Sequence, residues 1–294
     1  MERKTDCVVL NYNDADTTID MIRHIENYRA LDHIIIVDNC STDDSIDRLQ
    51  ELSNDRIIVL KSEKNGGYGA GNNLGVFYSH DQFHSDYVII ANPDVIFDEA
   101  CIIRLQELLD SDARCALAAP IQLTSSGNII QDYAWCFPTV WQAIFSAGHY
   151  LRRAVWKRYG YEWLRQKKDA GEVSAVVDCV PGAMLMVRTD EFFKLSGYDE
   201  RNFLYGEEAM LGKKIVKDGY YSKLLLTDTY IHNHSVSINK SIPKEIARYK
   251  LLLQGRYHFL KHYTDANPVQ LLMARIFFRL CILEKSVITW VKNI

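Results

Sequence analysis

The sequence predicts an α/β protein built on a mostly parallel, Rossmann-like sheet with helices on both faces. Over the first 120 residues, short strand-like runs alternate with helical patterns, as in parallel strands joined by crossover helices. The runs are continuously apolar, which is typical of strands covered on both faces. The four strand and helix pairs are Cys7–Leu10 with Thr17–Tyr28, Ile34–Val37 with Asp43–Leu52, Ile57–Leu60 with Asn72–Tyr78, and Tyr87–Ile90 with Glu99–Leu109.

Composition excludes several classes of protein. The 294 residues carry 34 Lys and Arg against 38 Asp and Glu, and this net charge of −4 argues against a dedicated nucleic-acid-binding protein. Seven scattered cysteines without a C-x-x-C pair indicate reduced core thiols. The N-terminus lacks a signal-peptide pattern and apolar runs stop at about five residues, far short of a membrane span. We therefore expect a cytoplasmic protein.

The character of the sequence changes from about residue 131. Residues 141–170 hold seven Lys or Arg against two acids, and four of the five tryptophans lie between 135 and 163. We interpret residues 138–170 as a helical insertion. Strand-like runs follow at Ala175–Val177 and Ala183–Val187, and a helical tail from about Pro243 is divided at Pro268.

Polar or glycine-rich segments follow each of the first four strands. A turn or helix-cap role would explain any one of them. Ligands of parallel sheets, however, bind at the carboxyl ends of the strands, so four such segments at one edge favour a binding site. The segments are Asn11–Asn13, Asp38–Asp43, Asn65–Asn73 and Asn92–Asp94.

The glycine-rich segment Asn65–Gly75 matches neither the G-x-G-x-x-G pattern of dinucleotide sites nor the Walker pattern. We expect a flexible loop whose backbone N–H groups approach a phosphate, helped by the amides of Asn72 and Asn73. Asp38 and Asp94 follow the second and fourth strands. One carboxylate can accept hydrogen bonds from a nucleoside, and another can hold Mg²⁺ against phosphate oxygens.

A second acidic centre opens a helical pattern at Glu207 and Glu208. Acids at a helix N-terminus are favourable in themselves. Burial beside Tyr198, Phe203 and Tyr205 would also raise a carboxyl pKa and make a general base.

Two histidines, His232 and His234, share one face of a strand-like segment. They are either metal or phosphate ligands or a structural pair, and the sequence leaves both readings open.

These blocks, in this order, resemble glycosyltransferase family 2 from about residue 6 to residue 237. Within the family the chain is most similar to rhamnosyltransferase-like bacterial enzymes of O-antigen and capsule assembly. The donor-binding half is matched by Val8–Asn13, Val37–Asp43, Asn65–Gly75 and Asn92–Asp94, and the acceptor and catalytic half by Pro181–Arg188, Gly197–Glu208 and His232–Ser237.

The resemblance implies a GT-A fold. The catalytic domain would span residues 1–240, with a nucleotide-sugar-binding half (1–120) and an acceptor half (121–240), and residues 241–294 would form a helical tail. The implied activity is inverting transfer of a sugar from a UDP- or dTDP-linked donor to a hydroxyl of a growing cell-surface glycan. The resemblance also implies a polyprenyl-diphosphate-linked acceptor and Mg²⁺ or Mn²⁺ as cofactor.

The resemblance also implies roles for single residues. Asp94 takes the metal position, with His232 and, less strongly, His234 beside it, and Glu208 or Glu207 takes the position of the base. The chain departs from the family's Glu-Asp-x-Asp-Leu-x-x-Arg pattern at Glu208, which is one methylene longer than the usual Asp, and at Met210 and Lys214. The residues expected to bind the donor are Asn11, Tyr12, Asn13, Asp38, Gly67, Asn72, Asn73 and Asn92.

Two other functions fit the same features less well. A nucleotidyltransferase also combines an α/β sheet, a glycine-rich loop and acidic metal ligands, but normally places that loop after the first strand. A degenerate transferase would act only as a nucleotide-sugar-binding module.

The insertion and the tail predict peripheral contact with the cytoplasmic leaflet of the membrane. Residues 141–170 carry a net charge of +5 and residues 266–294 carry +3. An amphipathic stripe of this kind either packs on its own domain or lies on a membrane. In the tail, the residues at helical spacing are Leu272, Ile276, Leu280, Leu283 and Val287.

Overall fold

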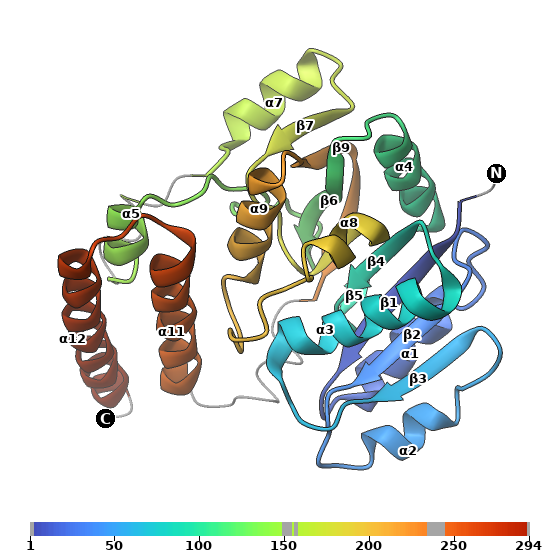
Figure 1. Ribbon diagram of the computed structural model, residues 1–294, viewed down its shortest axis with the longest axis horizontal. Coiled ribbons are helices and arrows are strands. Elements are labelled where there is room, and N and C mark those ends of the chain that lie inside the picture. Colours follow the sequence, from blue (N-terminus) through green and yellow to red (C-terminus); the bar gives the residue numbers. More distant parts are fainter. Residues whose placement is uncertain (1–2, 149–154, 156–157, 234–244, 293–294) are drawn as a thin grey trace.

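The computed structural model describes residues 3–148, 155, 158–233 and 245–292. Its centre is a nine-stranded sheet in the order β3-β2-β1-β4-β8-β6-β9-β5, with β7 paired to β9 (Figure 1). The strands are β1 (Thr5–Asn11), β2 (Ile34–Asp38), β3 (Ile57–Lys61), β4 (Tyr87–Ala91), β5 (Val95–Ile96), β6 (Cys115–Thr124), β7 (Ser174–Val177), β8 (Met184–Arg188) and β9 (Tyr221–His232).

The predicted parallel sheet is confirmed for the first half of the chain, where β3, β2, β1 and β4 run in the same direction. In the second half of the chain, parallel and antiparallel strand pairs are mixed. Strand β8 is antiparallel to both β4 and β6, while β6 and β9 are parallel. Strand β8 therefore joins the four parallel strands to β6 and β9 within one continuous sheet.

Helices cover both faces of the sheet, as the continuous apolar runs predict. In β1, Cys7 and Val9 belong to one core, whereas Val8 belongs to the core on the other face. The first core receives α1 (Ala15–Ile25), α2 (Ser45–Gln50) and α4 (Glu99–Asp110); the second receives α3 (Gly67–Tyr78), α8 (Thr189–Lys194) and α9 (Glu207–Lys217).

The glycine-rich segment is not the flexible loop that the sequence predicts. It forms the first two turns of α3, which continues into the short π-helix η1 (Ser79–Phe83). A Cβ at Gly71 would lie 2.3 Å from the Leu10 side chain, and one at Gly75 would lie 2.5 Å from Val8. The glycines therefore let α3 pack closely on β1, which a larger residue would prevent.

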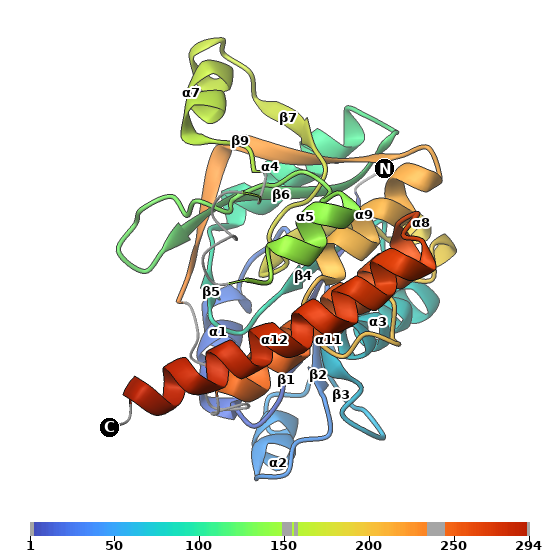
Figure 2. The same cartoon turned by 90° about the vertical axis from the view of Figure 1, so that its left-hand side faces the viewer.

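The predicted insertion divides into two parts that lie apart (Figure 1). Helix α5 (Val140–Phe145) packs with the C-terminal helices α11 (Glu245–Tyr263) and α12 (Pro268–Lys292), around a small core of their own. Helix α7 (Tyr161–Asp169) instead packs beside β7. The predicted division of the tail at Pro268 is confirmed, and α12 lies at the left-hand edge of the molecule in Figure 1 and in front of the other elements in Figure 2.

The cysteines are all free thiols, and five of the seven are buried, as expected for reduced core residues. Among the described residues, every helix is too short or too polar to span a bilayer.

Candidate active site

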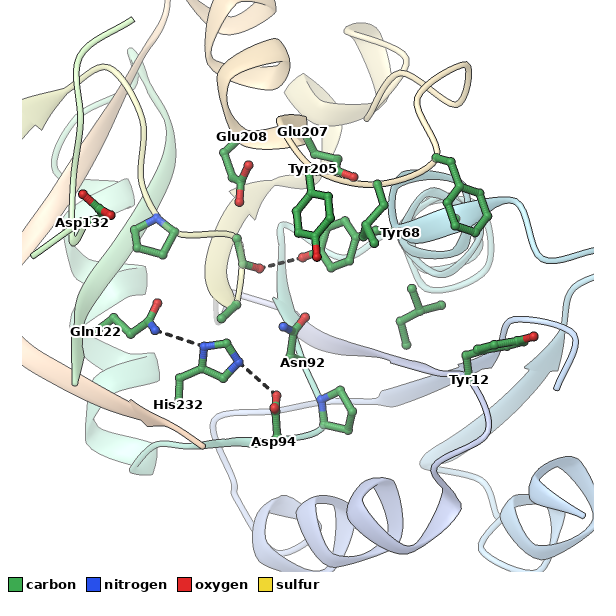
Figure 3. Close-up of a pocket in the computed structure, with 18 of the residues that line it drawn as sticks. Tyr12, Tyr68, Asn92, Asp94, Gln122, Asp132, Tyr205, Glu207, Glu208 and His232 are labelled. Atoms are coloured by element: carbon green, nitrogen blue, oxygen red, sulfur yellow. Dashed lines mark hydrogen bonds and ion pairs between the residues drawn. The ribbon is translucent and has the colours of Figure 1, made fainter. Parts of the chain in front are cut away.

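A cavity of about 750 Å³ lies at the carboxyl ends of the first strands, between the two halves of the chain. From the first half, Tyr12, Asn92 and Asp94 line it, and from the second half, Glu208 and His232 (Figure 3). The fold therefore brings the acidic residues of both halves of the chain to one cavity.

Asp94 and His232 meet although they are 138 residues apart. Strand β5 begins directly after Asp94 and pairs with the end of β9, where Val95 lies opposite His232. The backbone N–H of Asn233 also donates to the Asp94 carbonyl at 2.9 Å. As a result, His232 Nε2 lies 3.1 Å from Asp94 Oδ1, and both residues are buried.

Two further side chains orient His232 from behind. The Tyr230 hydroxyl donates to Gln122 Oε1 at 2.9 Å, so the Gln122 NH₂ group faces His232 Nδ1 at 3.0 Å. With this amide orientation, His232 carries its proton on Nε2 and donates it to Asp94. This line of hydrogen bonds from Tyr230 to Asp94 fixes the imidazole at the cavity wall, and Figure 3 shows its last three members, Gln122, His232 and Asp94.

Glu207 and Glu208 open α9 at the opposite side of the cavity. Gly206 precedes them with φ +93°, a turn that favours glycine. The Glu208 carboxyl points into the cavity, across from Asp94 and His232 (Figure 3). A Cβ at Gly182 would lie 3.2 Å from Glu208 Oε1, so the glycine leaves room for this carboxyl.

The two glutamates differ in their surroundings. Glu207 is only 5 % exposed and its Oε1 has no hydrogen-bond partner, whereas Glu208 is partly exposed. Burial raises the pKa of both carboxyls, and the charge of Glu208 raises the pKa of Glu207 further. Glu208 therefore points into the cavity, whereas Glu207 is the more buried carboxyl, whose ionisation is disfavoured by burial and by the charge of Glu208.

Tyr68 joins the two halves of the chain at the cavity. Its hydroxyl donates to the Gly182 carbonyl at 2.6 Å, and its ring contacts Tyr198 edge to face. Gly67, the residue before it, has φ +87°, and a Cβ there would lie 2.0 Å from the Phe203 carbonyl oxygen. Gly67 lines the cavity and is required by this close approach.

Several residues expected to bind the donor lie behind the cavity wall instead of on it. Asn11 Nδ2 donates to Asp38 Oδ1 at 2.9 Å, and the Ser41 hydroxyl donates to the same oxygen at 2.5 Å. Asn13 accepts from the Thr42 backbone N–H at 2.8 Å. These bonds tie together the loops after β1 and β2, and donor contact by these residues stays a prediction.

Asn72 and Asn73 are also buried away from the cavity lining. Asn73 Nδ2 donates to the Tyr198 carbonyl at 3.0 Å, and the Tyr198 N–H donates back to Asn73 Oδ1 at 2.8 Å. Asn73 thus fastens α3 to the segment that leads into α9. Tyr12 and Asn92, in contrast, line the cavity.

The departures from the family pattern have local explanations. Met210 is buried with Phe259 of α11, so an apolar contact occupies the position of the second acid. Lys214 Nζ donates to the carbonyls of Leu195 and Gly197, at 3.2 and 2.7 Å. His234 lies outside the described residues.

The structure adds site residues that sequence reasoning missed, namely Gln122, Tyr230 and Asp132, and it places Tyr205, expected beside the glutamates, on the cavity wall. Gln122 is a buried polar residue inside an apolar run, which is a signal that could have been used. Asp132 stands in an irregular segment without any such signal.

The glycosyl transferase family 2 model matches residues 6–158. The N-acetylglucosaminyl-diphospho-decaprenol L-rhamnosyltransferase of Mycobacterium tuberculosis H37Rv is 24% identical over 225 residues, which are 73% of this chain and 70% of the relative. The rhamnosyltransferase WbbL of Escherichia coli K12 is 23% identical over 198 residues, 65% of this chain and 69% of the relative.

Solved structures share the fold at low sequence identity. The mannosyltransferase PcManGT of Pyrobaculum calidifontis, in complex with GDP-Man and Mn²⁺, superposes with a TM-score of 0.58 at 16% identity, over 96% of this chain and 71% of that one. GalNAc-T7 with UDP, GalNAc and Mn²⁺ gives 0.61 at 16% identity over 79% of this chain, which spans 44% of the GalNAc-T7 chain. These likenesses confirm the predicted GT-A fold. Together with the family match across more than half of its length, they show that the chain belongs to glycosyl transferase family 2.

Proposed function

We propose that this protein transfers a sugar, with inversion, from a UDP- or dTDP-linked donor to a hydroxyl of a lipid-linked cell-surface glycan. The observation that carries the proposal is the opposition of Glu208 to the Asp94 and His232 pair across one cavity. Family membership favours this transfer over a nucleotidyltransferase.

Glu208 is proposed as the general base. Its carboxyl faces the cavity, and burial raises its pKa toward the range in which a carboxylate accepts a proton efficiently. The carboxylate would take the proton of the acceptor hydroxyl while the oxygen bonds to the anomeric carbon from the face opposite the diphosphate. The bond from that carbon to the diphosphate oxygen breaks in the same step, so the configuration inverts.

Asp94 and His232 are proposed as the residues that hold Mg²⁺ or Mn²⁺. The described residues contain no cluster of three or more potential ligands, but one carboxylate plus substrate phosphates commonly suffices for these ions. His232 can free its Nε2 if the Gln122 amide turns over, because the Tyr230 hydroxyl accepts as well as donates. When bound there, the ion supplies positive charge against the departing diphosphate.

The two halves of the catalytic domain are proposed to divide the substrates between them. The donor would lie along residues 1–120, where Tyr12, Gly67 and Asn92 line the cavity. The acceptor would enter from residues 121–240, along Asp132 and Tyr205. The decaprenol in the name of the mycobacterial relative supports a polyprenyl-diphosphate carrier, and hence work at the inner face of the cell membrane.

The test is incubation of the purified protein and Mn²⁺ with UDP-, dTDP- and GDP-sugars and a short-chain polyprenyl-diphosphate-linked acceptor. We expect one donor to be consumed and the NMR spectrum of the product to show the anomeric configuration opposite to that of the donor. Retained configuration would overturn the mechanism. Donor binding without hydrolysis or transfer would indicate a binding module.

A further inference from the structure

Helix α12 has a second apolar face besides the one that packs on the protein. Its inner face places Ala274, Phe278 and Cys281 in the small core shared with α5 and α11. Seven other apolar side chains of this helix are 42–66% exposed. We call them the outer stripe: Val269, Leu272, Met273, Ile276, Leu280, Leu283 and Val287.

The outer stripe is straight and continuous. At 100° per residue its seven members fall within an arc of about 100°, and they extend over roughly 27 Å of helix. No described element lies in front of α12 when the molecule is viewed from this side (Figure 2). A continuous apolar strip of this size is unusual on a surface that faces only water.

The charge of the chain is divided in a way that suits this face. Residues 245–294 carry eight Lys or Arg and three Asp or Glu, a net charge of +5, whereas the other residues carry −9. Arg275 and Arg279 are exposed on α12 and lie along one edge of the outer stripe. An anionic surface would therefore attract the C-terminal helices and repel the rest of the protein.

We propose that the outer stripe of α12 docks on an anionic lipid bilayer. A helix with one long apolar face and basic residues at its edge lies in the membrane interface, with its apolar side chains among the acyl chains. Pairing of two copies through the same stripe would instead bring two helices of net positive charge together, which is unfavourable. The inference deepens the proposed function, and rests on it for the lipid-linked acceptor.

Helix α11 connects the docked helix to the cavity. The buried Asp199 carboxylate accepts hydrogen bonds from His258 at 2.8 Å and Tyr263 at 2.9 Å, both on α11. A Cβ at Gly255 would lie 2.2 Å from the Tyr205 carbonyl oxygen, so α11 packs directly on the segment that lines the cavity. Docking through α12 would therefore hold this wall of the cavity at the membrane surface.

The experiment is co-sedimentation of the full chain with vesicles of phosphatidylcholine alone or mixed with phosphatidylglycerol. The test variant is the triple substitution Leu272→Gln, Ile276→Gln and Leu283→Gln. The control carries Val173→Gln, Val176→Gln and Val216→Gln, which change equally exposed apolar residues elsewhere. Thermal unfolding verifies that each variant folds.

We expect the wild type and the control to bind the anionic vesicles, and the stripe variant to bind at least tenfold more weakly. Salt should weaken the binding of wild type without abolishing it, because the apolar contact is not screened. Equal binding by the stripe variant, or none by the wild type, would overturn the proposal. So would a dimer that the stripe substitutions dissociate while vesicle binding stays unchanged.

The vesicles contain no donor or acceptor, so the result does not depend on the proposed function. The stripe variant should also hydrolyse a nucleotide sugar, or glycosylate a water-soluble acceptor, at the wild-type rate. If the wild type binds vesicles but shows neither hydrolysis nor transfer, the proposed function fails and the docking surface stands.

Discussion

The two acidic groups that face each other across the cavity differ in what surrounds them. Asp94 stands at a strand end beside His232, which donates a hydrogen bond to it. Glu207, which is buried, and Glu208, which is partly exposed, stand at a helix start, and no basic residue of the described chain shifts their pKa. A carboxylate beside a histidine that donates to it is suited to bind charge, whereas a desolvated carboxyl without a basic neighbour is suited to exchange a proton. The predictions below test this division of labour.

The largest effect is expected at Glu208. Glu208→Gln keeps the volume of the side chain but removes the proton acceptor, so kcat should fall by about 10²–10⁴ while donor affinity stays unchanged. Steady-state kinetics and calorimetric titration with the donor would measure the two quantities.

Glu207→Gln is the matched control and should keep most of the activity, because the amide resembles the neutral acid. In both the wild type and this variant, activity should fall on the acid side at a pH above the ordinary Glu pKa of about 4.3. An inactive Glu207→Gln beside an active Glu208→Gln would reverse the assignment.

The second-largest effect on activity is expected for Asp94→Ala. Losing this carboxylate should cost several kcal/mol of charge stabilisation, roughly 10²–10³ in kcat/KM, and weaken Mn²⁺ binding. The melting temperature should change little, since the residue lies in a turn. Turnover at the wild-type rate, or full activity of the wild type in EDTA, would contradict the metal assignment.

A smaller effect is expected for the two residues that orient His232, Gln122 and Tyr230. Gln122→Leu removes the group that orients His232, and loss of such a partner typically weakens metal affinity about 10–100-fold. Tyr230→Phe, one step further back, should weaken it less. Calorimetric titration with Mn²⁺ in the presence of a nucleoside diphosphate would rank the two. A stronger effect of Tyr230→Phe would show that His232 is oriented in another way.

The smallest effect concerns stability. The pKa of Glu207 is raised in the folded state, so the folded protein loses stability relative to the unfolded chain as pH rises from about 4.3 through the folded pKa. Glu207→Gln removes this loss, because the amide does not ionise. Urea unfolding at about pH 5 and about pH 8 should show a larger fall in the free energy of unfolding for the wild type than for Glu207→Gln, in which the raised pKa of Glu208 remains. Parallel changes in the two proteins would mean that Glu207 does not titrate in this range.

The same contrast separates what could be predicted from what could not. Asp94 and Glu208 were found from the sequence because each follows a recognisable local signal, the end of an apolar run or the start of a helical pattern. The prediction of a flexible loop at the glycine-rich segment was wrong, because its glycines allow the close contact of α3 with β1. Gln122 was missed because its partner on β9 is 110 residues away in sequence.

The sequence by itself determined the alternation of strands and helices, the polar edge of the sheet and the apolar periodicity of the tail. These features depend on neighbouring residues, whose spacing is visible in one dimension. Only the tertiary structure decided that His232 meets Asp94, that Asp38 lies behind the cavity wall, and that the outer stripe of α12 stays uncovered. Strand register and helix packing join distant residues, so the contact between two polar groups, or the exposure of an apolar face, depends on the whole fold.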